Sequence, residues 1–310
     1  AYYLAIFAMV FGSTFGTFNA ANATDSLAIA NGATFTVSQA DEATDFAAFA
    51  SNAVTANFSI SSGDFTLASL TADVAAENVV TVVDTGSSGA ITITGDLTLA
   101  DGAGDLKFIM ADKTTTLTFG GNVTDSTGTG NVVITANSND IVVISGTNKT
   151  IDATMDGIAD GEGTLRITGA GTTMADKVGT TGTTALAAID VNAAATFSST
   201  SEATAYTVDA DTTFTGTVLA NTGTTIGTSG TDVIYTAASN TGATALGAST
   251  TVTANSTLTT AALTLAAGSS VTANGIITTG DTTVTSGKTY LNVKDNVIDN
   301  IILVGTAELH

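Results

Sequence analysis

The residues best suited to bind a metal form an acidic, glycine-rich segment near the middle of the chain. Its acidic members are Asp152, Asp156, Asp160 and Glu162. Gly157 and Gly161 lie between them, and carboxylate oxygens on a flexible loop are the ligands that calcium prefers. The spacing fits neither an EF-hand loop nor the nonapeptide repeat of calcium β-rolls. These four residues are a candidate calcium site, with a solvated acidic turn as the simpler interpretation. The segment 101–105 is a weaker candidate.

Residues for acid–base or nucleophilic catalysis are scarce. The only histidine is His310, and there is no cysteine. We therefore expect no Ser-His-Asp triad, no histidine-based zinc site and no cysteine nucleophile. Acidic pairs such as Asp209 and Asp211 are interpreted as turn residues. A glycosidase would need two carboxylates about 5–10 Å apart in a cleft, and the sequence gives no sign of one. The chain is expected not to be an enzyme.

Charge and composition restrict the class of protein further. The 310 residues carry a net charge of −21 with only 7 Lys and Arg, which excludes a basic surface for nucleic acid. Anionic membranes would repel the chain as well. The absence of cysteine excludes disulfides and thiolate metal sites. Abundant Thr, Val and Ile favour pleated, half-buried surfaces, so the class is all-β.

A repeat of 19 residues fixes how these elements are arranged. Three columns of equivalent residues keep this step, one of them with Ile226 one place early. They are Phe214, Val233, Val252, Val271 and Tyr290; then Ile189, Val208, Leu246, Leu265, Val284 and Leu303; then Thr222, Thr241, Thr260 and Thr279. A short fixed period is typical of a solenoid, whose repeats bury their apolar faces only by stacking on neighbours. We predict a right-handed parallel β-helix with about 19 residues per coil in the C-terminal half.

Longer coils are predicted before this region. Ile93, Phe119, Ile144 and Ile167 are spaced by 26, 25 and 23 residues. Alternating apolar and polar residues, bounded by Gly, Asn and Asp, predict strands. The predicted strands are 34–37, 58–60, 79–83, 90–94, 97–99, 106–109, 116–119, 132–135, 141–144 and 165–168.

Four segments follow from these patterns. Residues 1–23 are interpreted as a secretory signal peptide, because an apolar block at 2–11 precedes Ala21-Asn22-Ala23. The alternative is a buried first strand. Residues 24–78 form an irregular capping region with a short helix over 41–53, residues 79–305 form the solenoid, and 306–310 are a tail or the start of a continuation. The apolar stretch 296–304 is either a final core strand or a contact with something outside the chain.

The segment 161–197 resembles a known type of repeat. It contains Gly161-Glu162-Gly163-Thr164-Leu165-Arg166-Ile167, then Lys177-Val178-Gly179, Ala185 to Asn192 and Ala195-Thr196-Phe197. This pattern is similar to the repeat unit of autotransporter passenger domains, rickettsial surface antigens and some surface-layer proteins. The resemblance implies a secreted β-helix on a Gram-negative cell surface, acting in adhesion or as a coat. It also implies outer-membrane attachment through a region not in this chain, and self-association or a host or surface glycan as partner. The translocator barrel of autotransporters has no counterpart here, and the family provides no catalytic motif.

Paired threonines leave a ligand-binding role open. They occur at Thr92/Thr94, Thr116/Thr118, Thr213/Thr215, Thr251/Thr253, Thr257/Thr259 and Thr283/Thr285. Rows of threonine on a flat face resemble several ice-binding proteins, although an ordinary outward threonine ladder is the simpler interpretation. We therefore predict a non-catalytic surface or structural solenoid. The alternatives are an adhesin or ice binder and, less favoured, a carbohydrate-active enzyme with a groove holding two carboxylates.

Overall fold

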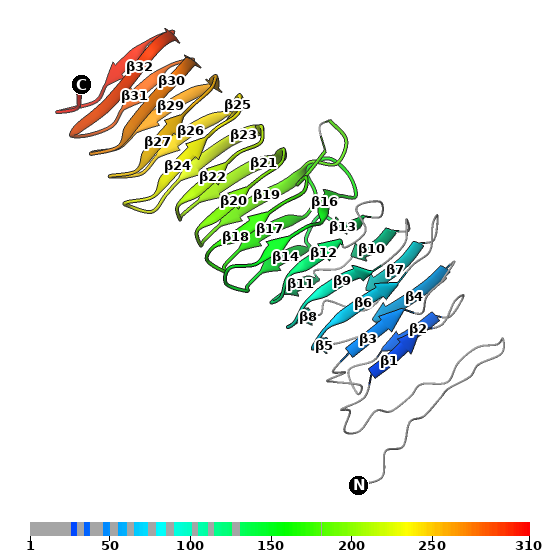
Figure 1. The fold of residues 1–310 in the computed structure, drawn as a ribbon. Coiled ribbons are helices and arrows are strands. Elements are labelled where there is room, and N and C mark those ends of the chain that lie inside the picture. The colour runs from blue at the N-terminus through cyan, green and yellow to red at the C-terminus, as the bar shows by residue number, and fades with distance from the viewer. Residues whose placement is uncertain are drawn as a thin grey trace.

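The protein is a long rod of stacked coils in the computed structural model (Figure 1). The structure describes residues 26–29, 34–37, 46–49, 55–60, 65–73, 79–84, 90–100, 105–110, 115–125, 131–180 and 182–310. Every element in these ranges is a β-strand, and none of them is a helix that could cross a membrane. The predicted signal peptide at 1–23 lies outside the described residues.

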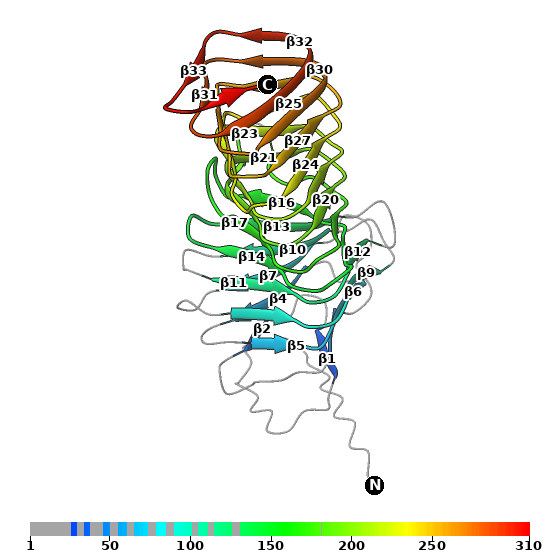
Figure 2. The same cartoon turned by 90° about the vertical axis from the view of Figure 1, so that its left-hand side faces the viewer.

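The strands form three stacks that run along the rod, and successive strands of a stack belong to successive coils (Figure 2). Stack 1 consists of β1 (Ser26–Ile29), β3 (Phe46–Phe49), β6 (Leu70–Asp73), β9 (Leu97–Ala100), β12 (Val123–Asp125), β15 (Thr150–Ile151), β18 (Thr172–Met174), β20 (Ala195–Phe197), β22 (Thr212–Phe214), β24 (Asp232–Tyr235), β27 (Thr251–Ala254), β30 (Ser270–Thr279), β32 (Lys288–Ile298) and β34 (Glu308–Leu309).

Stack 2 begins with β2 (Thr34–Val37), β4 (Thr55–Ile60), β7 (Val79–Asp84), β10 (Asp105–Met110), β13 (Val132–Ala136) and β16 (Thr154–Gly157). The single residue Val178 then continues it, because Val178 bridges Met155 on one side and Ser201 on the other. The stack goes on through β21 (Ser201–Val208), β23 (Val218–Ile226), β25 (Ser239–Asn240), β28 (Leu258–Thr260) and the second halves of β30 and β32.

Stack 3 contains β5 (Phe65–Leu67), β8 (Ala90–Ile93), β11 (Thr116–Phe119), β14 (Ile141–Ile144), β17 (Thr164–Ile167), β19 (Leu186–Val191), the second halves of β21 and β23, β26 (Ala243–Leu246), β29 (Ala262–Leu265), β31 (Thr282–Val284) and β33 (Ile301–Leu303). Pairing is parallel in all three stacks, as in β11 with β14 and β27 with β30. The predicted β-solenoid is therefore confirmed, and each coil pairs only with the coils before and after it.

A ladder of apolar side chains runs through the interior along stack 3. Its members pair from coil to coil in the order Ile93, Phe119, Ile144, Ile167, Val191, Val208, Ile226, Leu246, Leu265, Val284 and Leu303. All but the last are at most 3% exposed. Strands with alternating burial such as β11 place Leu117 and Phe119 inside and Thr116 and Thr118 outward. The predicted stacking of Ile93, Phe119, Ile144 and Ile167 is confirmed, as is the early position of Ile226.

The 19-residue column along stack 1 is correct only in its middle. Val233 pairs with Val252, and Val252 with Val271. Phe214, however, pairs with Tyr235 rather than Val233, and Val271 pairs with Leu291 rather than Tyr290. In the second column, Val208 pairs with Val191 rather than Ile189. The coils around Phe214 differ in length, which shifts the register.

The N-terminal strands follow the same pairing pattern as those after Val79. β1 pairs with β3, β3 with β6, and β2 with β4 and then β7. The helix predicted over 41–53 is wrong at Phe46–Phe49, which form strand β3. Apolar residues repeated at Phe46 and Phe49 fit a helical face as well as a strand. Pairing with a neighbour on each side decides for the strand, because it satisfies the backbone groups of these residues between coils.

Glycines stack at the corner that follows stack 3. A Cβ on Gly121 would lie 2.0 Å from the carbonyl oxygen of Gly95, and one on Gly169 would lie 2.0 Å from that of Gly146. Real Cβ atoms do not approach that closely. The corner is therefore narrow because these positions carry no side chain.

The last coil leaves core positions open. Leu303 is the final member of the stack 3 ladder and is 52% exposed, and the adjacent Ile301, Ile302 and Val304 are also exposed. The apolar stretch at 296–304 is thus a strand end plus β33, in register with β30 and β31. The predicted tail at 306–310 includes β34, which pairs with the start of β32.

Candidate functional site

The acidic loop of the candidate calcium site is held together by its own hydrogen bonds. Asp156 accepts hydrogen bonds from the hydroxyls of Thr180 at 2.9 Å and Thr184 at 3.2 Å. Glu162 accepts one from the backbone N–H of Ala159 at 3.1 Å, while Asp160 is exposed in the turn. Within the described residues, no group of three or more His, Cys, Asp or Glu could hold a metal ion. The structure uses two of these carboxylates to close loops, and calcium binding stays a prediction.

Asp152 lies apart from the other three, at the corner after β15. Partial burial, and then the nearby charges of Asp176 and Asp125, raise the pKa of Asp152 above its ordinary value of 3.8. Asp176 is itself occupied, because it accepts hydrogen bonds from the hydroxyl of Thr154 and from the N–H of Lys177. Asp152 therefore belongs to a column of like charges on successive coils.

Replacing Asp152 by Asn is expected to stabilise the protein at pH 7. A carboxyl whose pKa is raised by folding opposes folding once it is ionised, so its penalty is absent at low pH and grows as pH rises through the Asp range. Thermal unfolding of Asp152→Asn should therefore occur at a higher temperature than that of the unmodified protein at pH 7, and at the same temperature near pH 3. The matched control is Asp160→Asn on the exposed turn, which should change neither value. An equal gain at both pH values would contradict the electrostatic origin.

Other aspartates fasten one coil to the next. The Oδ1 atom of Asp96 accepts hydrogen bonds from the N–H and the side-chain amide of Asn122, whose own Oδ1 accepts from the N–H of Thr150. Asp140 is fully buried and accepts from the N–H groups of Thr115 and Asn137. These side chains satisfy backbone donors at the corners, where the strand ladder is interrupted.

The pairs weighed as acids in the sequence have similar roles. Asp209 accepts a hydrogen bond from the hydroxyl of Thr228 at 3.1 Å, and Asp211 accepts one from the N–H of Asp232 at 2.9 Å. Asp105 pairs with Lys107 at 3.8 Å and accepts from Asn131, while Asp101 lies outside the described residues. Arg166, the single arginine, pairs with Asp190 of the next coil at 3.2 Å.

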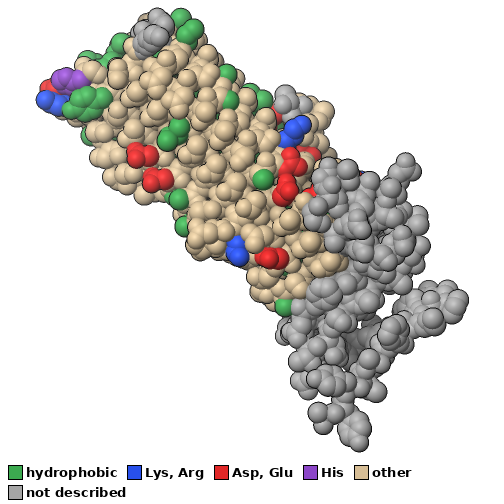
Figure 3. All heavy atoms as spheres, viewed as in Figure 1, with side chains coloured by type: hydrophobic (Ala, Val, Ile, Leu, Met, Phe, Trp, Pro, Cys, Tyr) green, Lys and Arg blue, Asp and Glu red, His purple; other side chains and the backbone are tan. Residues whose placement is uncertain are grey.

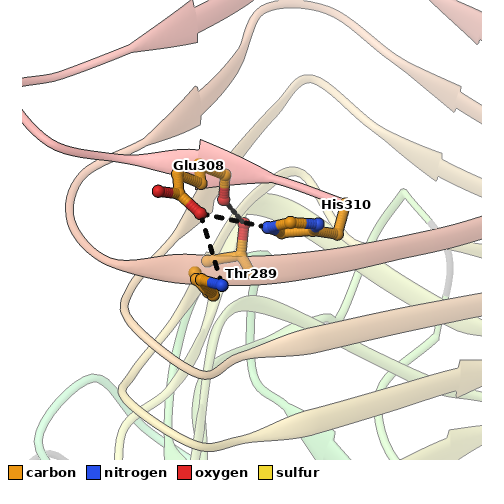
Figure 4. Close-up of polar contacts among 4 residues, drawn as sticks. Thr289, Glu308 and His310 are labelled. Carbon is orange, nitrogen blue, oxygen red and sulfur yellow. Dashed lines mark hydrogen bonds and ion pairs between the residues drawn. The ribbon is translucent and has the colours of Figure 1, made fainter.

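The single histidine lies in a small polar cluster at the last coil (Figure 4). Its Nε2 lies 3.2 Å from Oε2 of Glu308, and Nζ of Lys288 lies 3.7 Å from the same oxygen. The hydroxyl of Thr289 donates to the carbonyl of Glu308 at 3.4 Å. The hydrogen bond from His310, followed by the charge of Lys288, lowers the pKa of the Glu308 carboxyl. All three ionisable side chains are exposed, and they link β34 to β32.

Large aromatic side chains fill the core beneath this surface in coils 195–235. The ring of Phe214 stacks on Phe197 at 4.9 Å and on Tyr235 at 5.3 Å, and meets Tyr206 edge-on at 6.0 Å. Burial raises the pKa of the Tyr206 and Tyr235 phenols well above their usual range. The interior is therefore apolar and offers no passage for a ligand.

Threonines line the outer surface of stack 1. We call Thr150, Thr173, Thr196, Thr213, Thr253 and Thr272 the threonine row, because they occupy one register position on successive coils. Ile234 takes this position between Thr213 and Thr253 and is 36% exposed. The sequence placed Thr213 in phase with Thr251, whereas the structure pairs its position with Thr253 through Ile234. The row is therefore interrupted once.

A hollow of about 370 Å³ lies on stack 1 at this interruption. It is lined by Gly171, Ala194, Ala195, Thr196, Asp211, Thr212, Thr213, Asp232 and Ile234. The sequence did not identify this feature, since it depends on which residues of four different coils lie beside one another. The only signal for it was the weighed Asp209/Asp211 pair, of which Asp211 belongs to the hollow.

The surface around it is largely uncharged, with few acidic and basic side chains on the face seen in Figure 3. No family model, no curated protein and no solved structure matches this chain.

Proposed function

We propose that this chain is a non-catalytic structural module of the bacterial cell surface, serving as the coat or stalk of an exported protein. The observation that carries the proposal is the uninterrupted parallel ladder of coils, which converts the chain into a stiff rod. The resemblance of 161–197 to passenger-type repeats supports the location.

The outer faces support the same role. Outward positions along stacks 1 and 3 carry Thr, Ala, Gly and Asn, as in β22, β27 and β29. Small hydroxyl-bearing and uncharged side chains pair well along parallel strands and leave a smooth, soluble surface. The net charge of −21 keeps copies of the rod apart in solution.

Protease shaving of intact cells of the source organism tests this function. If the chain is a surface module, brief treatment with an added protease should remove epitopes of residues 131–310 from intact cells while leaving a cytoplasmic marker whole. Immunogold labelling of unpermeabilised cells should place the same epitopes outside the envelope. Epitopes that become accessible only after lysis would contradict the proposal.

Ice binding is favoured less by the structure than by the sequence. That role requires a regular row of hydroxyls, and Ile234 breaks the threonine row in its middle.

A further inference from the structure

The hollow on stack 1 arises from a local loss of side chains. The register that pairs Thr172 with Ala195, Ala195 with Thr212, and Thr212 with Val233 places the preceding residues in one outward row. That row reads Gly171, Ala194, Asp211, Asp232. Backbone hydrogen bonds from Gly171 to Ala194 at 2.8 Å and from Ala195 to Asp211 at 3.1 Å fix the coils in this order. Two coils thus contribute almost no side chain, and the next two contribute carboxylates.

The walls of the hollow combine two chemistries. The carboxylates of Asp211 and Asp232 stand on adjacent coils, about 4.8 Å apart at the backbone. Oδ1 of Asp211 is occupied by the N–H of Asp232, whereas no other described residue hydrogen-bonds or ion-pairs with the Asp232 side chain. Beside them lie the hydroxyls of Thr196 and Thr213 and the exposed side chain of Ile234.

Ile234 makes this position of the row different from its neighbours. Thr213 precedes it and Thr253 follows it in the same register. Both Asp232 and Ile234 are exposed, whereas Thr251 and Thr253 on the next coil are only half-exposed. β24 therefore forms a raised wall with a carboxylate and an apolar side chain on the same edge.

These groups select a ligand class. No Lys or Arg lines the hollow, so a phosphate, sulfate or uronic acid would meet only carboxylates. Two carboxylates, one already hydrogen-bonded, provide too few oxygens for a calcium ion, which takes six to eight. A neutral sugar ring matches the walls: its hydroxyls donate to a carboxylate in charge-assisted hydrogen bonds, and its C–H face packs on an aliphatic side chain. The volume lies at the lower end of the range of small-molecule sites.

We propose that the hollow formed by Gly171, Ala194, Asp211, Asp232 and Ile234 binds one or two rings of a neutral carbohydrate. Asp232 accepts hydrogen bonds from ring hydroxyls, Ile234 contacts the C–H face, and Gly171 and Ala194 leave the space that the ring occupies. The proposal does not depend on where the protein is located.

Nuclear magnetic resonance titration of the full chain tests the site. The probes are galactose, glucose and mannose, and the disaccharides lactose, cellobiose and maltose. We expect at least one of them to bind with a Kd of about 1 mM, typical of a shallow site. Asp232→Ala should weaken this binding about tenfold or more, because the strongest hydrogen-bond acceptor is lost. Ala194→Gln should abolish it by filling the hollow.

Thr253→Ala is the matched control, because it removes a hydroxyl of the threonine row one coil away from the hollow. It should bind the sugar as the unmodified protein does. Circular dichroism checks that each variant is folded, and the side chain of Asp232 holds no described contact whose loss would unfold it. Absence of binding to all six sugars, or equal binding by all variants, would overturn the proposal.

Two further outcomes have distinct meanings. Displacement of the sugar by calcium, with calcium affinity dependent on Asp232, would show a cation site and overturn the assignment to carbohydrate. Release of reducing sugar from lactose, cellobiose or maltose would show that Asp211 and Asp232 form a catalytic pair. It would contradict the proposed non-catalytic function while leaving the carbohydrate site in place.

Discussion

Phe214→Ala is expected to lower the free energy of unfolding by about 4 kcal/mol, the usual cost of removing a buried Phe side chain. Phe214 is 1% exposed and packs against aromatic rings of three neighbours, Phe197, Tyr206 and Tyr235. The cavity left by the ring is bounded by stacked strands, which cannot collapse without breaking their ladder. Chemical unfolding followed by far-ultraviolet circular dichroism measures the change.

The control for this variant is Ile276→Ala. Ile276 is 47% exposed, so its truncation should change the free energy of unfolding by less than about 0.5 kcal/mol. Hydrogen exchange adds a spatial test, since solenoid coils are stabilised by their nearest neighbours. Amides in 195–240 should exchange faster in Phe214→Ala, while those in 141–168 should not. Uniformly faster exchange along the rod would contradict the nearest-neighbour arrangement.

Gly169→Ala is expected to cost about 3 kcal/mol or more, because the added methyl group has no space. The new Cβ would lie 2.0 Å from the carbonyl oxygen and 2.6 Å from the carbonyl carbon of Gly146 on the preceding coil. Both atoms belong to the backbone, so the two coils must separate at this corner. The unfolding temperature and the yield of soluble protein should both fall.

Gly230→Ala separates this clash from the ordinary cost of replacing glycine. Gly230 has φ of +86° and no heavy atom within 4 Å of a built Cβ. Its replacement should cost only the left-handed backbone strain, about 1–2 kcal/mol. If Gly230→Ala proved more damaging than Gly169→Ala, the close approach of the glycine corner would be wrong.

Spacing in the sequence predicted the fold and much of its interior. The positions Ile93, Phe119, Ile144 and Ile167 stack as their spacing indicates, because apolar side chains at equivalent points of successive coils have only one interior to enter. The strands 116–119 and 141–144 have the predicted bounds. Alternation is a local signal, so it survives changes in coil length.

The register around Phe214 could not be predicted in this way. Phe197 to Phe214 is a step of 17 residues and Phe214 to Tyr235 a step of 21. These steps average to 19, so a fixed period passes through them without showing the shift. The hollow depends on that shift, since it places Asp211 beside Asp232 and both beyond Ala194. Pairing between coils, which the sequence does not display, determines the site.

The strictly sequential contact between coils also insulates one part of the rod from another. A mechanical or chemical perturbation at the exposed end near Leu303 reaches the coils at 171–234 only through every intervening layer. Fraying would therefore advance as a front from the end inward. The carbohydrate-facing coils would be among the later ones to open, so ligand recognition and loss of the distal layers are separable events.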